Sequence, residues 1–113
     1  TYLKDTRLRA LAIAGPNRLA SLPNIPTMAD AGLRGFDASA WFGISTQSGV
    51  PAETVAKLNA ALNKVIQMPD VRQRMEVADM TPGGGTPQEY GSLIARERVK
   101  WGDAVRRSGA RVD

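Results

Sequence analysis

Large apolar side chains are scarce in this chain, and their scarcity limits what the chain can fold into. Leu, Ile, Val and Phe together make up 24 of its 113 residues, little above the level of about one fifth below which chains tend to be disordered. Alanine supplies much of the remaining apolar content and adds little buried area, whereas burial stabilises by about 25 cal/mol per Å² of apolar surface. The length suits one domain, but small residues favour close packing between elements over a self-sufficient core.

The formal net charge of +4 raises the question of a nucleic-acid partner. Lys and Arg are spread along the whole chain and are interleaved with Asp and Glu, and no run of like charge reaches the roughly five residues typical of an interaction tail. The densest basic group, near the C-terminus, contains Glu97 and Asp103. We therefore expect a solvated helix face and no nucleic-acid partner.

Neither Cys nor His occurs in the sequence. Disulfides, thiolate metal sites and the usual nucleophile and base pairs are thereby excluded, and the carboxylates are too dispersed to suggest paired-carboxylate chemistry. We expect no enzyme, no catalytic residue, no metal and no cofactor. No apolar stretch approaches the ~18 residues that span a bilayer. Residues 1–7 have no apolar signal-peptide core, so an export signal would lie outside this chain.

Two segments of the N-terminal part are predicted to be strands. Residues 8–14 form a short apolar run that stops at Gly15, as in a buried strand of a parallel sheet; a helix turn is the alternative. Residues 36–46 carry Phe, Trp, Phe and Ile among small residues and predict a second strand. Between them, Thr27 is expected to cap a short helix of about two turns that ends at Gly32.

Three helices are predicted in the remainder. From Pro51 to Gln67, apolar residues recur at intervals of three and four, with Glu53 in the first turn placed to pair with Lys57. A shorter helix follows from Pro69 to about Ala78. The apolar positions of the first of these helices are Val55, Leu58, Leu62, Val65 and Ile66.

The third helix has the clearest boundaries. Thr86 as cap, Pro87 at the first position and Glu89 three residues after the cap form a capping box, and Gly109 is expected to end the helix after Ser108. The residues expected to face inward are Tyr90, Leu93, Ile94, Trp101, Ala104 and Val105. Strand, short helix, strand and three helices together predict an α/β fold.

Three residues are candidates for contact with a ligand. Arg18 follows the first predicted strand, where open α/β sheets bind ligands, and its guanidinium suits a carboxylate; alternatively, it anchors the proline-rich loop. Trp41 and Phe42 are adjacent in a predicted strand and should point to opposite faces, so at most one lines a given cleft, and core packing is the alternative for both. The glycines at 83–85 lack the residues of a phosphate-binding loop and are interpreted as a flexible approach to Thr86.

The order of several motifs resembles one family of proteins. An Arg-Ala-Leu-Ala-Ile run at 9–13 is followed by Leu-Pro-Asn-Ile-Pro-Thr-Met-Ala-Asp-Ala-Gly at 22–32, Trp-Phe-Gly at 41–43 and Gly-Val-Pro-Ala-Glu at 49–53. The chain in this respect resembles the Bug receptors, the periplasmic solute-binding receptors of tripartite tricarboxylate transporters. The resemblance extends over essentially the whole chain and corresponds to about the last third of such a receptor.

That resemblance implies a two-lobed Venus-flytrap fold of α/β lobes, with residues 1–46 as a strand-rich part near the hinge and residues 51–113 as a helical part. It also implies a periplasmic location, a small organic carboxylate captured by lobe closure, and membrane transporter subunits as partners. Much of the family's carboxylate recognition comes from N-terminal glycine-rich loops that this chain lacks, so we expect a partial site. Asp79 stands where the family frequently has Gly.

A function of a different class is also compatible with the sequence. A chain that presents unpaired sheet edges and apolar helix faces can act as a non-catalytic interaction or structural module, because an unpaired edge strand templates further pairing. Under this hypothesis the isolated chain forms a homo-oligomer.

Overall fold

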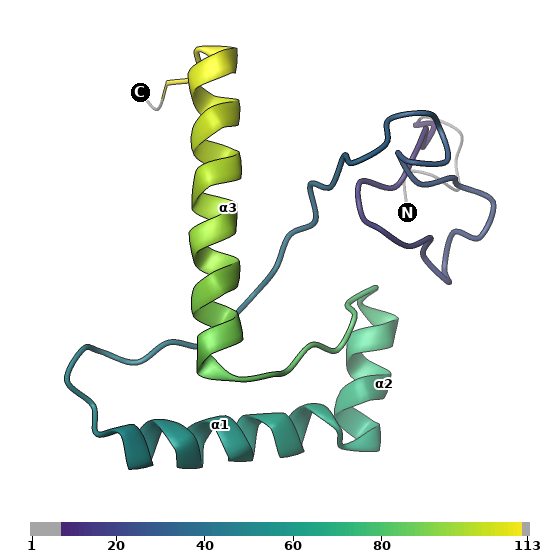
Figure 1. Ribbon diagram of the computed structural model, residues 1–113. Helices are drawn as coiled ribbons and strands as arrows, with labels where there is room; N and C mark the ends of the chain where they lie inside the picture. Colours follow the sequence, from purple (N-terminus) through teal and green to yellow (C-terminus); the bar gives the residue numbers. More distant parts are fainter. Residues whose placement is uncertain (1–7, 112–113) are drawn as a thin grey trace. The chain divides into compact units, whose positions relative to one another are not determined.

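The computed structural model describes residues 8–111, and the three helices predicted after residue 50 are present in it (Figure 1). They are α1 (Ala52–Ile66), α2 (Pro69–Val77) and α3 (Pro87–Ser108). The described residues divide into two compact units. The first contains residues 8–42 with Glu76–Met80, and the second contains Gly43–Met75 with residues 81–111.

Helix α1 has the predicted apolar stripe, but only part of it is covered. Val55, Leu62 and Ile66 are half-buried, whereas Leu58 and Val65 are each 45% exposed. The helix begins after Pro51, which is its N-cap and provides no side-chain cap bond. Pro51 thus lies just before the first helical residue, and its carbonyl accepts the first helical bond, from the Val55 N–H.

The boundaries of α3 are those that its capping residues predict. The Thr86 hydroxyl oxygen accepts from the Glu89 N–H at 3.2 Å, and the Glu89 carboxylate accepts from the Thr86 N–H at 2.7 Å. Gly109 ends the helix with φ of 67°, in the left-handed region where glycine has no steric penalty. The ring of Tyr90 lies so close to Gly43 that a Cβ at that position would overlap it.

Neither predicted strand is found in residues 8–111, which corrects this part of the α/β prediction. The nearest approach is an isolated parallel bridge between Ile13 and Thr27. Its bonds run from the Ile13 N–H to the Pro26 carbonyl at 2.8 Å and from the Met28 N–H to the Ile13 carbonyl at 2.9 Å. A strand requires a neighbouring ladder of hydrogen bonds, and apolar patterning within one segment cannot supply the neighbour.

The segment 36–46 also lacks a ladder. Its one backbone bond to the first predicted strand among the described residues joins the Ala38 N–H to the Ala14 carbonyl at 2.8 Å.

The predicted helix from Thr27 to Gly32 is a set of turns. Thr27 does cap it, and Gly32 does leave it with positive φ, at 98°. A single bond of helical spacing forms, from the Ala31 N–H to the Thr27 carbonyl at 3.0 Å. The glycine ends the segment before a second turn can offset the unfavourable first one.

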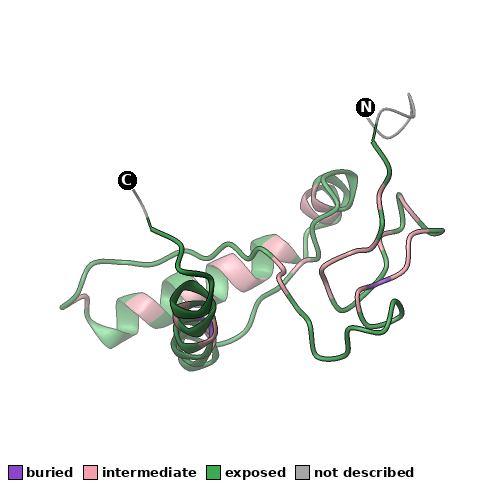
Figure 2. Ribbon diagram, turned by 90° about the horizontal axis from the view of Figure 1, so that it is seen from above, coloured by how far each residue is buried: buried purple, intermediate pink, exposed green. Residues whose placement is uncertain are grey.

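Large apolar residues are poorly covered throughout residues 8–111, as the scarcity of such residues predicts. No apolar side chain in this part of the chain is buried, and the two buried residues are Thr27 and Glu97, at 5% and 8% exposure. Figure 2 shows partly buried residues scattered along mostly exposed elements. Of the inward face predicted for α3, Tyr90 and Leu93 are half-buried. Ala104 is exposed, as are Ile94, Trp101 and Val105, at 41%, 44% and 51%.

Candidate functional site

The first unit is organised around the carboxylate of Asp30. Its Oδ2 atom accepts from the Thr27 N–H at 3.2 Å, and the Asp30 N–H donates to the Thr27 hydroxyl oxygen at 3.1 Å. This is the reciprocal arrangement of a capping box, formed on a turn. The Thr27 N–H, followed by the Arg18 guanidinium, lowers the pKa of Asp30 below its ordinary value of 3.8.

Arg18 lies against this turn. Its Nε and Nη2 atoms donate to Asp30 Oδ2 at 3.0 and 2.8 Å, and its Nη1 atom donates to the Pro23 carbonyl at 3.4 Å. The side chains of Arg18 and Asp30 are 52% and 44% exposed, so the ion pair faces solvent. Arg18 thus makes the contacts of an anchor of the proline-rich loop, and its role toward a ligand stays a prediction.

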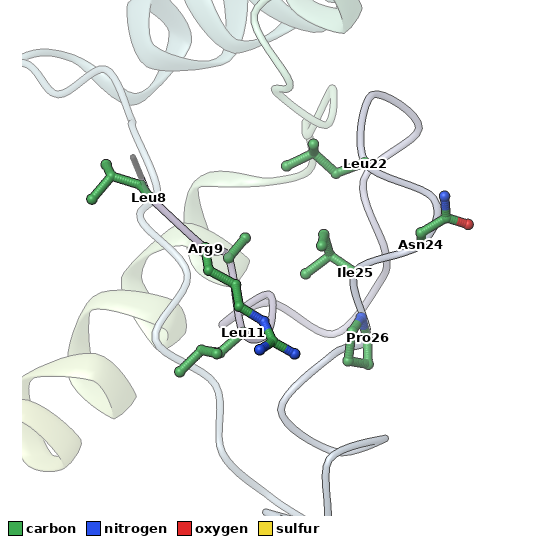
Figure 3. Close-up of a pocket in the computed structure, with 8 residues that line it drawn as sticks. Leu8, Arg9, Leu11, Leu22, Asn24, Ile25 and Pro26 are labelled. Atoms are coloured by element: carbon green, nitrogen blue, oxygen red, sulfur yellow. The ribbon is translucent and has the colours of Figure 1, made fainter. Parts of the chain in front are cut away.

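A hollow of about 700 Å³ opens beside this turn within the first unit (Figure 3). Leu8, Arg9 and Leu11 lie on one side of it, and Leu22, Ile25 and Pro26 lie on the other. Ala10 and Asn24 complete the lining. Because its walls are mainly aliphatic and Arg9 is their one charged residue, the groove suits an apolar occupant better than a small charged solute.

None of the three predicted ligand residues belongs to the lining of this groove. Trp41 and Phe42 are at the end of the first unit, where they are 39% and 82% exposed. Neither aromatic side chain lines the groove, and the predicted role of Trp41 or Phe42 in a cleft stays a prediction. The groove was not predicted from the sequence. The only signal for it there is the presence of leucines at positions 8, 11 and 22, followed by Ile25 and Pro26.

In the second unit, the glycine loop is held by α1. The Gly85 carbonyl accepts from the side-chain amides of Asn59 and Asn63, each at 2.9 Å, and the Gly85 N–H donates to the Asn63 side-chain oxygen at 2.9 Å. The loop is therefore tied to the helix and is not merely a flexible approach to Thr86. Since the Gly85 N–H has a protein acceptor, the loop does not present it to an anion. The sequence signal that could have predicted this tie is the pair Asn59 and Asn63, four residues apart on the partly buried face of α1.

Helix α3 carries a buried carboxylate. Glu97 accepts from Lys100 Nζ at 3.1 Å and from the Trp101 indole N–H at 2.8 Å, and Lys100 Nζ lies 5.2 Å from the centre of the Trp101 ring. In the sequence, Glu97 was noted only as an acidic residue within the basic group near the C-terminus. No group of three or more acidic residues in residues 8–111 is arranged to hold a metal ion. None of the helices in that range is long and apolar enough to cross a membrane.

A solved structure shows which class of protein this arrangement belongs to. The structure of R. palustris Rpa4515 with adipate has a TM-score of 0.78 and 27% identity to this chain, and the match covers 96% of this chain and 36% of that protein. The fold is therefore that of part of a periplasmic-binding-type protein.

Sequence comparison gives the family. Residues 1–110 match the family described as the tripartite tricarboxylate transporter family receptor, and the chain belongs to this family. BugT of Bordetella pertussis is 32% identical over 111 residues, which are 98% of this chain and 34% of that protein. A UPF0065 protein from the tcbD-tcbE intergenic region of Pseudomonas sp. strain P51 is 36% identical over 96 residues, which are 84% of this chain and 29% of that protein.

The chain thus spans about a third of the length of these relatives. The receptors of this family are periplasmic solute-binding components of transporters and are not enzymes.

Proposed function

We propose that this chain is the C-terminal third of an extracytoplasmic receptor that captures a small organic carboxylate between two closing lobes and delivers it to membrane transporter subunits. The observation that carries the proposal is the match of 96% of the chain to an adipate-bound protein at a TM-score of 0.78. The family membership of residues 1–110 supports it. In this proposal the chain is periplasmic, residues 1–46 lie near the hinge, and residues 51–113 form the helical part of a lobe.

Arg18, Trp41 and Phe42 are the residues that we propose to contact the carboxylate. Arg18 uses Nε, Nη1 and Nη2 in its bonds to Asp30 and Pro23, but each terminal nitrogen of a guanidinium has a second N–H. A ligand carboxylate on the outer side would accept from these remaining N–H groups while Asp30 holds the side chain in place. One of the two aromatic side chains would line the cleft.

A chimaera tests the function. The matched 36% of Rpa4515 is replaced by this chain, and adipate binding is measured by isothermal titration calorimetry. We expect affinity within about tenfold of Rpa4515 itself, a difference of about 1.4 kcal/mol. A chimaera that unfolds cooperatively but binds no adipate or other dicarboxylate would contradict the proposal.

Substitutions in the same chimaera test the contact residues. Arg18→Gln should weaken adipate binding at least about tenfold, as expected for loss of a charge-assisted hydrogen bond. Arg34→Gln, at another exposed arginine, serves as the control. Only one of Trp41→Leu and Phe42→Leu should weaken binding; if both or neither do so, the proposed cleft position is wrong.

The exposed apolar surface favours a second candidate function, that of a self-associating interaction module. Sixteen large apolar residues of the described part are exposed, among them Leu11 at 75% and Phe42 at 82%. Size-exclusion chromatography with light scattering should then give a mass above 12.1 kDa that falls on dilution. A monomer at all concentrations would eliminate this candidate without affecting the receptor proposal.

A further inference from the structure

Gly43 has an aromatic ring in the space where any other residue would have its side chain. A Cβ at this position would overlap the Cε2, Cζ and Oη atoms of Tyr90. Gly43 is not among the glycines with positive φ, so its backbone conformation does not call for glycine. The close approach of the ring does. Residues 41–47 belong to neither a helix nor a turn, and the ring of Tyr90 restricts this irregular segment at Gly43.

The position of the Tyr90 ring is set by the start of α3. The Tyr90 N–H donates to the Thr86 carbonyl at 3.1 Å, and Thr86 belongs to the capping box that begins the helix. The preceding residue, Gly85, is bonded to two asparagine side chains of α1. Tyr90 is itself half-buried. Because α1, the glycine loop and the capping box fix the start of α3, they also fix the ring that lies against Gly43.

The two residues that precede Gly43 are the aromatic candidates for the ligand cleft. Adjacent side chains of an extended segment point to opposite faces, so a half-turn of the backbone about its own axis would exchange the faces of Trp41 and Phe42. Phe42 is 82% exposed, so its own packing contributes little to its direction. A ring held against Gly43 restricts this rotation one peptide bond away from Phe42.

We propose that Tyr90 is a positioning residue, which by holding the Gly43 backbone determines which of Trp41 and Phe42 faces the bound carboxylate. The inference rests on the proposed function, because that function assigns one of the two aromatic side chains to the cleft. Tyr90 acts through Gly43 and needs no contact with the ligand. The alternative is that Tyr90 and Gly43 are ordinary packing, in which case their loss lowers stability without a specific effect on either aromatic residue.

A double-mutant cycle in the Rpa4515 chimaera separates these roles. Tyr90→Ala should weaken adipate binding at least about threefold, within the range of coupling between residues of one network. In the Tyr90→Ala background, whichever of Trp41→Leu and Phe42→Leu weakens binding should lose most of its effect, because the aromatic side chain is no longer directed to the ligand. Effects of Tyr90→Ala and the aromatic substitution that simply add would overturn the proposal.

Two variants of α3 are the controls for this cycle. Leu93→Ala changes another half-buried residue of the helix; it should lower stability, and any effect that it has on binding should add to that of the aromatic substitution. Tyr90→Phe retains the Cε2 and Cζ atoms that lie against Gly43, and its adipate affinity should stay within about twofold of the parent chimaera, well inside the coupling expected for Tyr90→Ala. Coupling of Leu93→Ala as strong as that of Tyr90→Ala would assign the effect to general packing.

A matched pair of glycine substitutions tests the other side of the contact. Gly43→Ala places a methyl group in the Tyr90 ring, whereas Gly91→Ala places one in open space on α3. Gly43→Ala should weaken adipate binding about as much as Tyr90→Ala, and the two together should add little, because both disrupt the same contact. Gly91→Ala should leave binding unchanged. Equal effects of the two glycine variants would contradict the proposal.

Backbone order in the isolated chain tests the contact without a ligand. The NMR order parameters of the Phe42 and Gly43 amides should be near about 0.85, the value of rigid backbone, and should fall toward about 0.6 in Tyr90→Ala and Gly43→Ala. Low order in the unsubstituted chain would overturn the proposal. Adipate binding with additive effects retains the receptor function and rejects the positioning role. A folded chimaera that binds no dicarboxylate rejects the function, and the role of Tyr90 toward a ligand with it, even where the order parameters show the contact.

Discussion

At the scale of single residues, the Asp30 carboxylate concentrates several contacts on one atom. Its Oδ2 accepts from the Thr27 N–H and from two nitrogens of Arg18. Hydrogen bonds to the charged form favour that form, and so does a neighbouring cation. The turn beside the groove is therefore held by an ionised side chain.

The first prediction concerns the titration of Asp30. Because its pKa is lowered in the folded chain, the carboxylate contributes stability above its unfolded pKa, and this contribution is lost as the pH falls through the folded pKa. NMR titration should place the pKa of Asp30 below 3.8. Arg18→Gln should raise it only part of the way, since the Thr27 N–H is the larger cause. A wild-type pKa at or above the ordinary value would contradict this account, and Arg34→Gln provides the control.

The second prediction concerns Asp79, which follows α2 with φ of 54°. This left-handed conformation is unfavourable for most residues and free for glycine. Asp79→Gly should stabilise the chain by less than about 1 kcal/mol, because the gain in the folded state is offset by greater freedom in the unfolded state. Asp79→Val should destabilise it by about 1 kcal/mol or more. Urea unfolding measures both, and Asp79→Asn separates the charge from the conformation; a destabilising Asp79→Gly would refute the argument.

At the scale of elements, the features that depend on contiguous sequence were predicted correctly, whereas the features that depend on distant residues were not. The capping box of Thr86 and Glu89, the stop at Gly109 and the spacing of Val55, Leu62 and Ile66 are properties of contiguous sequence, and α1 and α3 follow from them. The strands failed because a strand depends on a partner elsewhere in the chain. The tie between α1 and the glycine loop was not predicted for the same reason, since it joins residues more than twenty positions apart, as in the contact of Asn63 with Gly85.

The third prediction tests that tie. Asn63→Ala removes both bonds between residue 63 and the Gly85 backbone and should lower the free energy of unfolding by about 1–3 kcal/mol at about 0.5–1.5 kcal/mol per bond. Alanine also favours the helix by several tenths of a kcal/mol, so the measured loss is a lower bound. Asn17→Ala, at an exposed position outside the helices, should change stability little. Unchanged stability in Asn63→Ala, measured by urea unfolding, would show that the tie is not maintained in solution.

At the scale of the whole molecule, the low content of large apolar residues in the sequence agrees with the structure. No apolar side chain in residues 8–111 is buried. The family could be predicted from the sequence because ordered motifs identify a lineage. The contacts of Arg18, Trp41 and Phe42 with a ligand stay a prediction, because Arg18 bonds to Asp30 and Pro23 and neither aromatic belongs to the groove lining.

The last prediction concerns cooperativity. The slope of the unfolding free energy against urea scales with the surface exposed on unfolding and is about 1–3 kcal/mol/M for small proteins. Because so little apolar surface is buried in the described part of the chain, the isolated chain should fall at or below about 1 kcal/mol/M, with helical circular dichroism lost over a broad range. The Rpa4515 chimaera should unfold with a steeper slope, since the exposed leucines of the groove and the apolar face of α1 would be covered there. A sharp transition of the isolated monomer, with a slope near 2 kcal/mol/M or more, about that of an ordinary small domain, would mean that the chain is a complete folding unit by itself.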